Sequence, residues 1–154
     1  MALMDTNAVI LKYLTTPSAA TNPLLALIKT GAVTRIYCPR APENAILPNV
    51  TFFTRGGTST PYIPDKPLPS VQFDCWAKDV EVGGMITEKG SIIAREVYRA
   101  LYDALQGIQN IDVVIGINTY VILSAREEVQ GQDLVDTDIP GRFRVLTFFE
   151  IQVK

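Results

Sequence analysis

The chain has 154 residues, with 14 basic and 16 acidic side chains and a formal net charge of −2. A chain of this length can bury a core of its own, so we expect one domain over residues 1–154. The balanced charge does not favour a nucleic-acid groove or an anionic membrane surface as the main partner. The absence of histidine excludes most zinc sites and every His-dependent triad.

The cysteines and the hydropathy pattern also exclude several classes. Cys38 and Cys75 lack a CxxC spacing, and free thiols are favoured over a disulfide in a chain without a secretory leader. No apolar run approaches the ~20 residues that a membrane-spanning helix needs. We therefore expect a soluble chain without metal, cofactor or membrane partner.

The first residues, 1–31, predict two short helices before any strand. Asp5 or Thr6 can cap the first helix, and a proline marks its end. Asn22 can cap the second helix, since asparagine is a favoured N-cap residue and proline suits the first helical position. Gly31 is expected to end this helix.

Two strand candidates follow these helices. The segment VTRIYC, which begins at Val33, is rich in β-branched and aromatic residues. A second candidate runs from Val50 to Thr54 and is expected to end at Gly56-Gly57. A phosphate cradle is the alternative interpretation of this glycine pair, but a turn is favoured because the pair does not stand between a strand and a helix.

A proline-rich arm is expected over residues 58–69, which contain four prolines in twelve residues. This density forbids a helix and favours an extended, polyproline-like excursion. Tyr62 and Ile63 give the arm an apolar tip, so both are candidate interface residues.

The next segment, from Ser70 to Lys78, alternates with a period of two, as a strand with one buried face does. Its expected buried residues are Val71, Phe73, Cys75 and Ala77. Trp76 lies on the opposite face, where it is either an interface anchor or a side chain covered by a loop of its own chain. Gly83-Gly84 then breaks the pattern, and we interpret it as a turn.

The longest helix is predicted at about residues 88–106, with Gly107 as its stop. Its apolar residues recur at helical spacing, and they are Ile93, Val97, Ala100, Leu101, Ala104 and Ile108. This face should cover the sheet, while the charged face should be solvated.

The last third predicts a long β segment over residues 111–135, which fades into the polar run EEVQGQD and can break in two. An alternating terminal strand is predicted over residues 140–154. Segregated strands with one main helix indicate an α+β fold. We expect an antiparallel-rich β-sheet with helices packed on one face, one long crossover helix and extended loops.

Acidic residues gather between Ala125 and Pro140, which we interpret as the tip of a hairpin, where they face the single arginine Arg126. They are Glu127, Glu128, Asp133, Asp136 and Asp138. Carboxylates suit calcium or magnesium, but the spacing misses the EF-hand pattern, so a solvated acidic turn is favoured over a cation site.

Catalytic motifs are absent from the sequence, which contains no GxGxxG, GxxxxGK[ST], HExxH or GxSxG. We therefore expect a protein that is not an enzyme. Two rivals stay open: a small enzyme or ligand-binding domain with a pocket between helix and sheet, and a binding adaptor that works as a monomer or dimer.

The order of segments from Ala45 to Lys154 resembles a known family. KPLPSVQFDCWAKD, a glycine loop, IIAREVYRALYDALQG and AREEVQGQDLVDTDIPGRFRVLTFFEIQV follow one another. This succession resembles the tail-completion proteins of long-tailed phages, the tail terminator or tail-to-head joining family. The alternative within this class is a neighbouring neck component, such as a head-completion or adaptor ring protein.

The resemblance implies a structural virion protein that is assembled in the host cytoplasm. It implies a ring, generally a hexamer, at the head-proximal end of the tail, with the tail-tube protein and a head-completion or connector protein as partners. DNA would pass through the ring's channel without sequence-specific binding. In such a ring the five acidic residues would line the channel or its rim and repel DNA; a solvated turn at the outer edge is the alternative.

Overall fold

The computed structural model describes residues 4–59, 61–63 and 66–154. Its helices are α1 (Thr6–Thr15), α2 (Asn22–Ile28) and α3 (Gly90–Leu105). Its strands are β1 (Lys29–Thr30), β2 (Val33–Thr34), β3 (Ile36–Tyr37), β4 (Asn49–Thr58), β5 (Leu68–Lys78), β6 (Val80–Val82), β7 (Met85–Glu88), β8 (Gln109–Ile115), β9 (Asn118–Val135) and β10 (Arg142–Val153).

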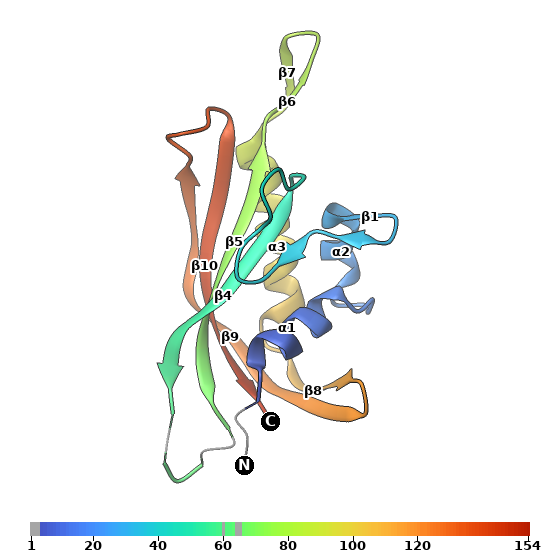
Figure 1. The fold of residues 1–154 in the computed structure, drawn as a ribbon. Coiled ribbons are helices and arrows are strands. Elements are labelled where there is room, and N and C mark those ends of the chain that lie inside the picture. The colour runs from blue at the N-terminus through green and yellow to red at the C-terminus, as the bar shows by residue number, and fades with distance from the viewer. Residues whose placement is uncertain (1–3, 60, 64–65) are drawn as a thin grey trace.

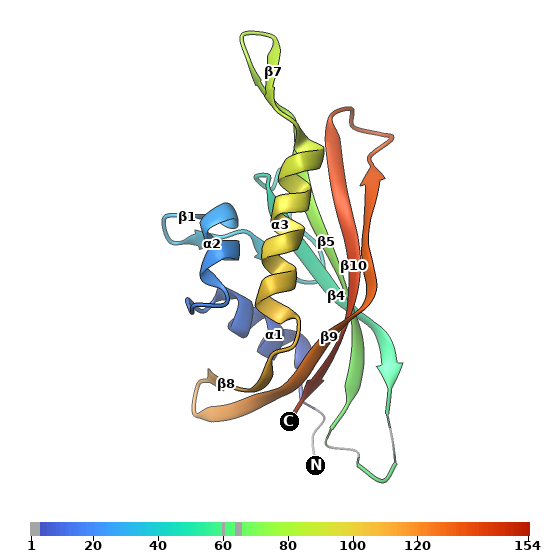
Figure 2. The same ribbon diagram turned by 180° about the vertical axis from the view of Figure 1, so that it is seen from behind.

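A six-stranded sheet with the order β3-β4-β5-β10-β9-β8 forms one layer of the molecule. The three described helices pack on one face of this sheet (Figures 1 and 2). β3 and β4 are parallel, and the other strand pairs of this sheet are antiparallel. The predicted α+β class, with an antiparallel-rich sheet and helices on one face, is therefore confirmed. No helix in the described ranges is long and apolar enough to cross a membrane.

The N-terminal helices begin and end partly as predicted. Asp5 caps α1, and its Oδ1 accepts a hydrogen bond from the backbone N–H of Ala8 at 3.2 Å. The N-cap of α2 is Thr21 rather than the expected Asn22. Gly31 does not end α2, because Lys29 and Thr30 leave the helix and pair with Thr34 and Val33. Gly31 instead lies in the turn of that small hairpin, with a φ of 60°.

The predicted strand from Val33 is broken in two at Arg35. The buried Arg35 guanidinium donates hydrogen bonds to the carbonyls of Pro48 at 2.8 Å and Leu27 at 3.1 Å. Its backbone N–H donates to Ile28 O at 2.9 Å. These bonds tie the chain to the end of α2, so β2 and β3 belong to different sheets.

The strand was expected to end at Gly56-Gly57, and this expectation is wrong. β4 continues to Thr58, with a register shift against β5 between Thr54 and Gly57. A Cβ at Gly57 would lie 2.3 Å from Leu68 O, and its φ is +126°. Only glycine permits this close approach, which lets the strands stay paired into the arm.

Gly83-Gly84 forms the turn of a separate hairpin, β6–β7, which extends beyond the main sheet (Figure 1). The sequence had predicted only a turn here. α3 begins at Gly90 rather than at Glu88, because Glu88 pairs with Val80 in this hairpin. Asp79 Oδ1 accepts from the Gly90 N–H at 2.7 Å and so satisfies one free donor of the first helical turn.

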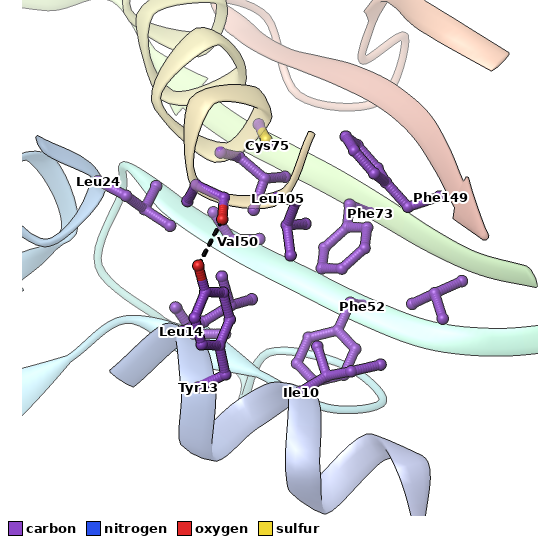
Figure 3. Close-up of a cluster of buried hydrophobic side chains, with 14 of the residues drawn as sticks. Ile10, Tyr13, Leu14, Leu24, Val50, Phe52, Phe73, Cys75, Leu105 and Phe149 are labelled. Atoms are coloured by element: carbon purple, nitrogen blue, oxygen red, sulfur yellow. Dashed lines mark hydrogen bonds between the residues drawn. The ribbon is translucent and has the colours of Figure 1, made fainter. Parts of the chain in front are cut away.

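The core lies between the helices and the sheet (Figure 3). Phe73 stacks on Phe52 at a centroid distance of 5.4 Å and meets Phe149 edge to face at 5.8 Å. Tyr13 donates a hydrogen bond to Ala104 O at 2.6 Å, which joins α1 to α3. The predicted inner face of β5 is confirmed, since Val71, Phe73, Cys75 and Ala77 are fully buried. The predicted inner face of α3 is confirmed for Val97, Ala100, Leu101 and Ala104.

The long C-terminal β segment breaks after Ile115, as the sequence allowed. β9 is 18 residues long, and it pairs with β8 through one half and with β10 through most of its length. Its pairing with β10 reaches Val135, which lies opposite Phe143.

Candidate assembly surfaces

The outer face of the sheet, opposite the helices, is built around Trp76 of β5. The indole Nε1 donates to Thr51 Oγ1 at 3.1 Å. The guanidinium groups of Arg142 and Arg144 lie over the ring, at 4.5 Å and 5.2 Å from its centroid. Trp76 is therefore half-buried beneath side chains of β10, rather than covered by a loop of its own chain.

Asp74 is buried on this outer face, with 4% of its surface exposed. Gln72 Nε2 donates to Asp74 Oδ2 at 2.9 Å, and Arg144 donates to Oδ1 at 3.4 Å. Arg55 in turn donates to Gln72 Oε1 at 3.1 Å. Burial raises the pKa of Asp74, and the Gln72 hydrogen bond and the Arg144 charge only partly oppose this rise. A polar network therefore fixes the outer face of β5.

The five predicted acidic residues do not share one hairpin tip. Glu127, Glu128 and Asp133 lie within β9, because its pairing with β10 continues to Val135. Only Asp136 and Asp138 lie in the turn, where Asp136 Oδ1 accepts from the Asp138 N–H at 2.9 Å. The expectation of a single acidic tip is wrong for the first three residues. Within the described ranges, no cluster of three or more metal-ligating side chains forms.

The prediction that these acids face a single arginine, Arg126, is wrong. Arg126 binds Glu150 at 2.8 Å, whereas Asp133 binds Arg95 at 3.2 Å. Asp136 lies 3.8 Å from the Arg142 Nε. Asp133 and Asp136 are therefore each paired with a separate arginine, one from α3 and one from β10.

Glu127 points to the helix-covered side. Its Oε2 accepts hydrogen bonds from Tyr98 Oη at 2.7 Å and from Thr147 Oγ1 at 2.8 Å. The Tyr98 hydroxyl also accepts from the Gly131 N–H at 3.2 Å, and a Cβ at Gly131 would lie 2.7 Å from the Tyr98 ring. Burial and the Glu127 hydrogen bond raise the pKa of Tyr98. Glu127 therefore helps to attach α3 to β9 and is not a solvated turn residue.

The proline-rich arm is the exposed end of the β4–β5 hairpin. It is shorter than predicted, because Thr58 pairs with Leu68 and Gly57 with Pro69. Tyr62 is 91% exposed and Ile63 is 46% exposed. Residues 60, 64 and 65 of the predicted arm lie outside the described residues.

The β6–β7 hairpin is a second exposed apolar projection, and sequence reasoning missed it. Val82 is 66% exposed, Met85 73% and Ile86 55%. A glycine pair between the short β-rich runs VEV and MIT is a hairpin signal that could have identified it.

An apolar groove of about 490 Å³ lies between the C-terminal half of α1 and strand β8. Its apolar lining includes Tyr13, Ile111, Val113 and Val114, and its charged residues are Lys12 and Asp112. β8 is an edge strand of the sheet, so the groove lies beside unpaired strand backbone.

The comparisons with family models and with curated proteins give no relative from which a function could be transferred. No family model matches the chain, and no curated protein matches it. The function has to be inferred from the surfaces described above.

Proposed function

We propose that this protein is a structural subunit that forms a hexameric ring at the head-proximal end of a phage tail. There it ends the tail tube and joins the tail to the head. Its partners are copies of itself, the tail-tube protein and a head-completion or connector protein, and DNA passes through its channel without sequence-specific binding. A neighbouring neck ring, such as a head-completion or adaptor ring, is the alternative within the same class.

The observation that carries this proposal is the pair of hairpins that extend from the sheet with exposed apolar side chains. The β4–β5 hairpin presents Tyr62 and Ile63, and the β6–β7 hairpin presents Val82 and Met85. Exposed apolar projections are typical of subunits that complete their packing on a neighbour. The order of sequence motifs from Ala45 to Lys154, which resembles the tail-completion family, supports the location in the tail.

The two cysteines support a structural rather than a catalytic function. Cys75 is buried and Cys38 is half-buried, and both are free thiols. Burial raises the pKa of both thiols, and Asp74 and Asp5 raise them further. A thiol with a raised pKa is a poor nucleophile at neutral pH.

The acidic residues proposed for the channel or its rim divide into two groups. Glu127 is engaged with Tyr98 and Thr147 on the helix-covered side, so we assign it to the fold. Asp136 is half-buried and paired with Arg142, so we assign it to the fold as well. Glu128, Asp133 and Asp138 are exposed, and although Asp133 pairs with Arg95, we retain the three as candidates for a surface that repels DNA.

Size-exclusion chromatography with light scattering tests the ring directly. The 17.0 kDa chain should elute as a hexamer at micromolar concentration, or form one when it is mixed with tail-tube protein. A monomer under both conditions would contradict the proposal.

Phage that lack the protein distinguish the two positions within this class. Loss of a tail terminator should give tails of uncontrolled length, because nothing ends the tube. Loss of a neighbouring neck ring should leave tails of normal length that do not join heads.

A further inference from the structure

We propose that the β6–β7 hairpin of one copy docks in the groove between α1 and β8 of the next copy. This inference rests on the proposed ring, and it names the two surfaces of each copy that would meet to close that ring. The occupant of the groove is thus a second copy of this chain.

The hairpin has the composition of a docking element. Every residue of β6 and β7 is exposed, and Val82, Met85 and Ile86 are more than half exposed. An isolated two-stranded hairpin is marginally stable in water, because it has no layer to pack against. Burial of these side chains on a neighbour would supply that layer.

Of the two edges of the six-stranded sheet, the β8 edge is the better receptor for a hairpin. The opposite edge of the sheet is formed by β3, which has two residues, and beyond it β4 contains the register shift at Gly56-Gly57. β8 offers seven residues at the other edge, without proline. The groove volume of about 490 Å³ lies within the range of about 300–1,000 Å³ that is typical of ligand pockets.

The positions of hairpin and groove require contact between different copies. The hairpin projects from one end of the molecule, and β8 lies at the other end (Figures 1 and 2). A hairpin therefore cannot reach the groove of its own chain. Contact between unlike surfaces is heterologous, and it forms a ring when the rotation between copies closes.

The groove offers the acidic hairpin one charged partner. From Val80 to Glu88 the hairpin carries Glu81 and Glu88 and no basic residue. The groove carries the exposed Lys12 on α1, together with Asp112 on β8. Lys12 and Asp112 cancel in net charge, so the specific contact available is a pair between Lys12 and one acid of the hairpin, and an added acid on β8 should repel the hairpin.

Two variants, each disabled on one surface, test the contact. Val82→Ser with Met85→Ser removes the apolar tip, and Val114→Glu places a repelling charge in the groove. All three positions are more than half exposed, so the fold should persist, which circular dichroism checks. Ile46→Ser, at a position that is 69% exposed and belongs neither to the hairpin nor to the groove lining, is the matched control.

Each variant alone should fail to form rings, with a dissociation constant between copies raised at least about tenfold, whereas the Ile46→Ser variant should assemble. An equimolar mixture of the two should form dimers but no rings, because only one good hairpin and one good groove remain. Light scattering and native mass spectrometry measure this.

Rings from the hairpin variant would overturn the inference while leaving the proposed function standing. The same holds if the hairpin variant forms rings but no longer binds the tail-tube protein, since the hairpin would then contact the tube. Absence of dimers in the mixture would also overturn it. A wild-type chain that never forms rings would instead contradict the proposed function.

Discussion

The two faces of β5 are both buried, but by different means. On the helix-covered face, Phe73 and its apolar neighbours lie beneath helices, and removal of apolar surface from water stabilises the contact. On the outer face, Asp74 is almost as inaccessible, although no described helix covers it. There, long side chains reach across from β4 and β10 and are held by hydrogen bonds and cation–π contacts. The first face should therefore control whether the chain folds, and the second should adjust its stability.

The largest effect is expected on the helix-covered face, from Leu101→Asp. Leu101 is fully buried, so aspartate would place an unpaired charge against the sheet, at a cost of several kcal/mol, roughly 3–5. This approaches the ~5–15 kcal/mol stability of a typical domain, and cooperative thermal unfolding should be lost. Arg99→Asp, on the exposed side of α3, is the matched control. A natively folded Leu101→Asp at wild-type yield would show that a different helix face is inward.

A smaller effect is expected on the outer face, from Asp74→Ala. This change leaves Gln72 and Arg144 without their acceptor, and it should lower the unfolding free energy by about 1–3 kcal/mol. Urea denaturation measures it. Arg126→Ala breaks a more exposed ion pair and should have a smaller effect. Equal effects of the two variants would mean that the burial of Asp74 has no energetic consequence.

An effect equal to that of Asp74→Ala or smaller is expected from Tyr98→Phe, which removes the hydroxyl that donates to Glu127 and accepts from Gly131. Glu127 keeps its bond from Thr147, while the Gly131 N–H loses its acceptor. The unfolding free energy should fall by about 1 kcal/mol. Tyr102→Phe, which keeps the ring contact with Phe149, is the control and should change stability less. No difference between the two variants would contradict a role for the Tyr98 hydroxyl.

The pH dependence of the unfolding free energy should report the burial of the Asp74 carboxyl on the outer face. The pKa of Asp74 is raised in the folded protein, so the folded state holds its proton more tightly than the unfolded state does. Its contribution to stability is present below the unfolded pKa of about 3.9 and is lost as the pH rises through the folded pKa. The unfolding free energy of the wild type, relative to Asp74→Asn, should therefore fall as the pH rises from about 4. A constant or rising difference would contradict the assigned shift.

The smallest effect on stability is expected from deletion of the arm between Ser59 and Asp65. The strands stay joined at the pair of Thr58 and Leu68, and the core lies elsewhere. Thermal unfolding should change little, whereas assembly with tail-tube protein should be impaired. If the deletion unfolds the protein, the arm belongs to the core.

Sequence periodicity predicted the faces of β5 and α3, because one side of each element must be apolar. It could not predict the outer-face network, since contact between Trp76 and Arg144 depends on the register between β5 and β10. β9 was expected to end early, because EEVQGQD has low β-propensity, but pairing with β10 overrides this preference. The break at Arg35 likewise depends on tertiary hydrogen bonds. The proline-rich composition predicted that Tyr62 and Ile63 stand on an exposed arm, whereas the exposed β6–β7 hairpin was not predicted.

The close approach of Gly131 to Tyr98 should also restrict which residues homologous chains can carry at these two positions. A Cβ at position 131 would lie 2.7 Å from the ring, so a side chain there and an aromatic ring at position 98 exclude each other. Among homologous chains, these two sites should therefore change together: where glycine is replaced at the first, a smaller residue should stand at the second. The exposed turn at Gly83 requires no such partner, because a Cβ there meets no atom within 4 Å. Its sequence should be restricted only by the backbone of the turn.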